Sequence, residues 1–84
     1  MGDNHEHARR AEEQKLRQLR TATERVCTLI LLTDMPAVDI AIERQEAREL
    51  CAELFPDRLD LYDLIYESRF DRLWEQFRDP EEGS

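Results

Sequence analysis

The sequence predicts an all-α protein of three helices joined by tight turns that contain proline. Both glycines lie within two residues of a chain end, which excludes hairpin turns that need glycine. Residues 8–32 contain neither glycine nor proline and are rich in Ala, Glu, Gln, Leu and Arg, which favour helices. The three prolines, Pro36, Pro56 and Pro80, divide the rest of the chain, because the residue before a proline avoids the helical conformation.

The first predicted helix covers residues 8 to about 33. Its side chains at alternating spacings of three and four predict one buried face. That face contains Leu16, Leu19, Thr23, Val26 and Ile30. Residues 26–33 also have the composition of a buried strand, but the chain holds no second strand to pair with it. Only pairing across a dimer would restore that alternative.

The second helix is expected from residue 36 to about 54, and the third from residue 57 to about 78. Asp57 is the predicted N-cap of the third helix, with Asp60 three residues later at the matching capping-box position. The main buried face of the second helix is Ile40, Ala47, Leu50, Cys51, Leu54 and Phe55. That of the third is Leu59, Tyr62, Tyr66, Phe70, Leu73 and Phe77, with Trp74 at its margin. Cys27 and Cys51 lack the number and spacing of a disulfide or metal framework, so we interpret both as small buried apolar residues.

The 84 residues are enough for a single domain. We expect that domain over residues 8–78, a disordered segment over 1–7 and an acidic tail over 79–84. The chain carries a net charge of −8. Residues 1–33 hold six basic and five acidic side chains, and residues 34–84 hold six basic and fifteen acidic. No apolar run approaches the length of a membrane span or a signal peptide, so a cytoplasmic protein is expected.

All three predicted helices carry apolar side chains outside their main buried faces. A helix that is apolar all round must be buried all round, and three helices cannot surround one another in that way. We therefore predict self-association, most simply as a homodimer. The predicted interface residues are Leu29, Ile30, Leu31, Leu32, Val38, Ile42, Leu61, Leu64 and Ile65. The favoured function is a small acidic interaction module without catalytic activity or cofactor, whose carboxylates select a protein partner with a basic surface.

A second hypothesis is a Mg²⁺-dependent nucleotide pyrophosphohydrolase. Carboxylate ridges on the second and third helices could hold a hard cation between them, with Glu46, Glu49, Asp60 and Asp63 as candidate ligands. The pair Glu46-x-x-Glu49 resembles the first half of the Glu-x-x-Glu and Glu-x-x-Asp pattern of all-α nucleotide pyrophosphatases. Asp60-x-x-Asp63 departs from the second half, so no family assignment follows.

A third hypothesis uses the basic first helix on nucleic acid through Arg9, Arg10, Arg17 and Arg20. The acidic remainder of the chain would repel a phosphate backbone, so nucleic acid is an unlikely partner. Arg44 lies beside the apolar face of the second helix. It is expected either to pair with a carboxylate of another helix or subunit, or to extend its charge into solvent.

Overall fold

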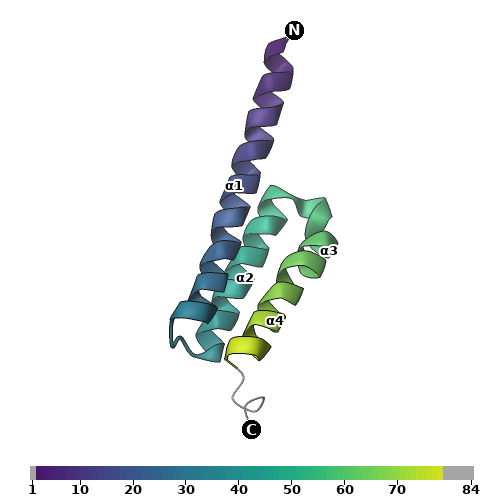
Figure 1. Ribbon diagram of the computed structural model, residues 1–84. Helices are drawn as coiled ribbons and strands as arrows, with labels where there is room; N and C mark the ends of the chain where they lie inside the picture. The colour runs from purple at the N-terminus through teal and green to yellow at the C-terminus, as the bar shows by residue number, and fades with distance from the viewer. Residues whose placement is uncertain (1, 79–84) are drawn as a thin grey trace.

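The computed structural model describes residues 2–78, and their side chains from residue 8 onward. The chain forms three helical rods that run down, up and down beside one another (Figure 1). The first two rods are α1 (Gly2–Leu32) and α2 (Ala37–Leu54). The third is built from η1 (Pro56–Arg58), α3 (Leu59–Tyr62), η2 (Asp63–Glu67) and α4 (Ser68–Phe77). No strand occurs in this part of the chain, so the predicted all-α fold of three helices is confirmed and the strand alternative is wrong.

The first helix begins earlier than predicted. The backbone of α1 is helical from Gly2, whereas the sequence predicted a start at residue 8. The N-terminal half of α1 extends beyond the other two rods (Figure 1), and the described chain measures 62 × 23 × 18 Å. The predicted acidic tail at 79–84 lies outside the described residues.

The core runs along the centre of the three rods. Phe70 and Ile30 are completely buried, and every rod contributes. The buried apolar residues are Leu19, Val26, Ile30, Ile40, Ala47, Cys51, Phe55, Tyr62 and Phe70. Thr23 is buried among them because its hydroxyl donates to the carbonyl of Arg20 at 3.0 Å. The predicted buried face of the first helix is thus confirmed from Leu19 to Ile30, while Leu16 remains about half exposed.

A short connection joins α1 to α2. The Thr33 hydroxyl donates to the Leu29 carbonyl and accepts from the backbone N–H of Met35 at 3.2 Å, which satisfies polar groups at the end of α1. Pro36 then precedes α2 with extended backbone, and its carbonyl accepts from the N–H of Asp39 at 3.0 Å. Proline suits this place because its ring is compatible with the start of a helix.

Arg78 fastens the end of the third rod to this connection. Its guanidinium donates to the Ile30 carbonyl at 3.1 Å and to the Met35 carbonyl, and it stacks on the Trp74 ring at 4.6 Å. The carbonyls at a helix C-terminus carry partial negative charge and lack helical partners, so a cation there is stabilising. Arg78 was predicted only as the end of the third helix, and its contact with α1 was not predicted.

The third rod begins differently from the prediction. Its first turn is the 3₁₀ segment η1, which follows Phe55, and no side chain caps it. The capping role predicted for Asp57 and Asp60 is therefore wrong. Pro56 accounts for the difference, since proline is favoured at the first helical position. The helical turn therefore begins at Pro56, with Phe55 at the N-cap instead of Asp57.

The middle of the third rod is a π turn. Over η2 the backbone N–H of Ser68 bonds to the carbonyl of Asp63, five residues earlier. A π turn contains more residues than an α turn, so it rotates the following residues relative to a uniform helix. Phe77 was predicted on the buried face but is 58% exposed, while Arg78 lies half-buried against α1. Phe70 and Phe77 both follow this turn, so it does not account for the exposure of Phe77; Phe77 is the last residue of α4, at the end of the rod, where the other rods cover it less.

Candidate interaction surface

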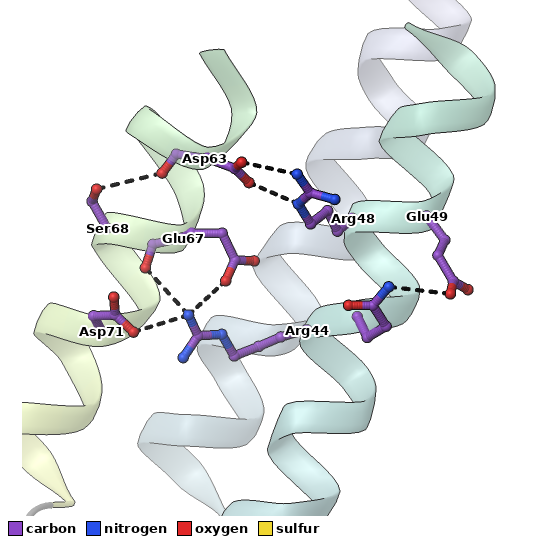
Figure 2. A network of polar contacts seen from close by, with 8 residues as sticks. Arg44, Arg48, Glu49, Asp63, Glu67, Ser68 and Asp71 are labelled. Carbon is purple, nitrogen blue, oxygen red and sulfur yellow. Dashed lines mark hydrogen bonds and ion pairs between the residues drawn. The ribbon is translucent and has the colours of Figure 1, made fainter. Parts of the chain in front are cut away.

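A polar seam joins α2 to the third rod (Figure 2). Arg48 donates from Nε and Nη2 to the two carboxylate oxygens of Asp63, at 2.8 and 2.9 Å. These paired hydrogen bonds lower the pKa of Asp63 and raise that of Arg48. A two-pronged contact of this kind fixes the orientation of both side chains as well as their distance.

Arg44 makes the second half of the seam. Its Nη2 donates to the Glu67 carboxylate at 2.6 Å and to the Asp71 carboxylate at 2.9 Å, and its guanidinium lies 5.5 Å from the centre of the Phe70 ring. Burial disfavours the charged form of Arg44, but the hydrogen bonds to Glu67 and Asp71 outweigh it and raise its pKa. Of the two outcomes expected for Arg44, the structure shows the ion pair with another helix.

The spacing of these residues was a signal that the sequence analysis did not use. Arg44 and Arg48 are four residues apart on α2, and Asp63, Glu67 and Asp71 are spaced by four on the third rod. Side chains four apart share one helix face. Two such faces of opposite charge on neighbouring antiparallel helices match each other, and this match identifies Arg48 and three of the acidic residues.

The candidate metal ligands are not gathered into one site. Asp63 is hydrogen-bonded to Arg48, and Glu49 accepts from the Gln45 side chain at 3.2 Å on a different side of α2 (Figure 2). Asp60 and Glu46 are both exposed. Among the described residues no group of three or more Asp, Glu, His or Cys side chains could hold a metal ion.

The predicted interface residues differ in how far the single chain buries them. Ile30 is completely buried in the core of the single chain, and Leu29 is half-buried against that core. Ile30 therefore cannot form an external contact, because the neighbouring rods already cover it. The other seven are exposed: Leu31, Leu32, Val38, Ile42, Leu61, Leu64 and Ile65.

Four exposed apolar residues form the α3 patch, which we define as Leu16, Leu61, Leu64 and Ile65. Three of these residues border a mainly apolar hollow of about 140 Å³ between α1 and the third rod. Leu64 is the most exposed of the patch, at 71%. The hollow lies where α1 leaves the other rods, so a helix docked there would cover the patch and the base of the projecting half of α1.

Three exposed apolar residues of α2 form a second surface, the α2 patch, which we define as Val38, Ala41 and Ile42. Val38 is 66% exposed, and the patch continues along α2 into a shallow groove bordered by Gln45, Glu46 and Glu49. It lies on a different side of α2 from the polar seam, whose arginines point to the third rod (Figure 2). This face of α2 is thus apolar at its beginning and acidic further along.

The projecting half of α1 forms a basic arm, which we define as residues 8–20. It contains five basic and two acidic side chains. All of its side chains are exposed except Leu19, which is buried at its root, and Lys15, which is half-buried. Arg9, Lys15, Arg17 and Arg20 form no ion pair with another described residue.

Besides Thr23, the interior contains the polar groups of Cys27, Cys51 and Tyr62. Cys51 is buried and Cys27 half-buried, both are free thiols, and burial raises the pKa of each. Burial also raises the pKa of Tyr62 well above its usual range. Tyr62 Oη is the buried side-chain oxygen in the described chain that has no hydrogen-bond partner.

Comparison with protein-family models, with curated proteins and with solved structures gives no match for this chain. Within the described residues, no helix combines the length and the apolar character that crossing a membrane requires. The exposed features of the folded chain that could bind a partner are the α2 patch, the α3 patch and the basic arm.

Proposed function

We propose that this chain is a small acidic helical interaction module that self-associates as a homodimer and docks on a further protein, without catalytic activity. The supporting observation is the set of large apolar side chains that the folded single chain leaves exposed. They are Leu16, Leu31, Leu32, Val38, Ile42, Leu61, Leu64, Ile65 and Phe77. Clustered apolar surface on a small protein is typical of an interaction site.

Burial energies support association at these patches. Moving a Leu, Ile or Val side chain from full exposure to full burial is worth about 1.5–3 kcal/mol. The patch residues are partly covered already, so each retains a part of that gain for an intermolecular contact. In a symmetric dimer every patch residue counts twice, because both subunits present the same surface.

The proposed partner beyond the dimer carries a basic surface. Asp39, Glu46 and Glu53 on α2 are exposed and form no ion pair with another described residue. Such charges accelerate encounter and select partners more than they strengthen binding. A cytoplasmic location remains a prediction from the sequence.

The hydrolase hypothesis lacks a specific supporting observation. Its best-placed carboxylate, Asp63, is held by Arg48, so a cation there would have to compete with a two-pronged ion pair. We therefore do not propose it.

Sedimentation velocity tests self-association. Between about 1 and 100 μM we expect the sedimentation coefficient to rise from that of a monomer to that of a dimer, since standard interfaces often have dissociation constants in or below this range. Two double variants, V38S/I42S and L61S/L64S, remove apolar side chains from the α2 and α3 patches. We expect at least one of them to stay monomeric throughout.

The matched control is Gln76→Ser, an exposed polar position outside both patches. It should leave the concentration dependence unchanged. A wild-type chain that remains a compact folded monomer over the whole range would refute the proposal.

A further inference from the structure

The first half of the basic arm has only exposed side chains, whereas Leu19 at its root is buried in the core. From Ala8 to Gln14 every side chain is exposed, and in Figure 1 this part of α1 stands clear of the other rods. A helical stretch shorter than about 12–15 residues is marginal in water unless it packs against something. A contact with another surface would therefore stabilise this part of the arm.

The charges of the arm and of α2 are complementary. Arg17 and Arg20 are exposed near the root of the arm and form no ion pair with another described residue. Glu46 and Glu53 on α2 are exposed and equally unpaired. The third carboxylate of that ridge, Glu49, contacts only the neutral Gln45 side chain.

The apolar parts of the two surfaces also correspond. Leu16 lies on the arm directly before Arg17 and is about half exposed. On α2, Ile42 lies one turn before Glu46 and is likewise about half exposed. Each surface thus presents an apolar side chain followed by charges of opposite sign to those on the other.

Residues 8–14 of the arm continue the helix α1 beyond the end of α2, away from the other two rods, and do not reach this face within their own chain (Figure 1). Further along, Arg17 borders a shallow groove with Leu50 of its own α2. A second copy can present its arm on the acidic face of α2, and the exchange is reciprocal because each copy supplies one arm and one acidic face. Such reciprocity is the property of a closed two-fold dimer.

We propose that the dimer forms by arm exchange, in which the basic arm of each copy docks on the face of α2 that carries Val38, Ile42, Glu46 and Glu53 in the other. This inference rests on the proposed self-association and adds its geometry. The α2 patch supplies apolar contact, and the charges set the placement of the arm. Exposed ion pairs are individually weak, so several of them together with the apolar contact are required.

Charge exchange tests the inference in the full-length chain. The variant R17E/R20E makes the arm acidic, and E46K/E53K makes the α2 face basic. Each alone should weaken dimerisation about tenfold or more at low salt, because like charges then face one another at both contacts. An equimolar mixture of the two should regain dimerisation, since every acidic arm then meets a basic face and every basic arm an acidic face.

The matched control is R69E/R72E, which reverses two exposed arginines of α4 that form no ion pair with another described residue. Its dimerisation should equal that of the wild type, and circular dichroism should show the same helix content for all variants. High salt should reduce the differences, since it screens exposed charges.

The outcomes separate the two proposals. A wild type that never dimerises overturns the proposed function and arm exchange together. A wild type that dimerises while both charge variants dimerise equally well overturns arm exchange alone and leaves the arm for another partner, such as nucleic acid. Weakened single variants that do not recover on mixing also overturn it, because the arm then contacts a surface other than α2.

Discussion

Tyr62 brings an unsatisfied hydroxyl into the core. Its side chain is 2% exposed, its ring lies 5.2 Å from that of Tyr66, and Oη has no partner. A buried polar group without a hydrogen bond costs about 1–3 kcal/mol. The ring contributes to packing while its hydroxyl opposes burial.

We therefore expect Tyr62→Phe to raise the free energy of unfolding by about 1 kcal/mol, because it keeps the ring and removes the unpaired oxygen. Urea denaturation followed by circular dichroism measures the change. The half-buried Tyr66 offers a matched control, since Tyr66→Phe removes a hydroxyl that is not sealed in the core. A loss of stability in Tyr62→Phe would mean that the hydroxyl has a partner in solution.

Asp63 provides a pH-dependent contribution to stability. The hydrogen bonds from Arg48 hold its pKa below the usual value of about 3.8. Folding therefore favours the ionised carboxylate. Its contribution is fully present above the ordinary pKa of aspartate and is lost as the pH falls through the lowered value.

Carbon-detected NMR titration of the Asp63 carboxyl group should show this lowered midpoint in the wild type. In Arg48→Gln the midpoint should return toward the usual value, because the charged donor is gone. The stability difference between this variant and the wild type should shrink in strong acid. An unchanged midpoint in Arg48→Gln would show that the pair does not persist in solution.

At the scale of the element, the burial of side chains on α4 depends on their position along the helix. Periodicity placed Phe70 and Phe77 on one face, and the structure buries Phe70 completely while leaving Phe77 58% exposed. Both residues follow the π turn between Asp63 and Ser68, so its rotation does not separate them; Phe77 is the last residue of α4, at the end of the rod. Arg78 then lies against α1, where the carbonyls of Ile30 and Met35 accept its hydrogen bonds.

The two phenylalanines should therefore respond very differently to truncation. Phe70→Ala should lower the free energy of unfolding by about 3–5 kcal/mol, as is usual for a buried aromatic side chain. Phe77→Ala should cost much less in the monomer, since more than half of its surface is already in water. Thermal or urea denaturation at low protein concentration makes the comparison, and equal losses would contradict the observed difference in burial.

At the scale of the whole molecule, the main feature is that three helices are too few to cover all of the chain's large apolar side chains. Three rods bury one continuous core, and nine large apolar side chains of the described residues remain exposed around it. A chain of this size has a high ratio of surface to volume. A second copy is the most economical way to cover the α2 and α3 patches, and the projecting arm provides a means of reaching it.

Much of the helical architecture was predictable because the signals are local. Each of these signals acts within one helix or turn. They are the absence of Gly and Pro from residues 8–32, the position of Pro36, and the spacing of Leu19, Val26 and Ile30. These features correctly indicated an all-α chain of three helices and much of its core. They also indicated an excess of apolar residues, and seven of the nine side chains named from that excess are exposed in the folded chain.

The remaining features depend on how the helices lie against one another. The register at which Arg48 meets Asp63 and the contact of Arg78 with the end of α1 each join residues far apart in the chain. Composition and periodicity describe one helix at a time and cannot supply the register between two. Only the packed structure sets that register, because it balances the burial of all three helices at once.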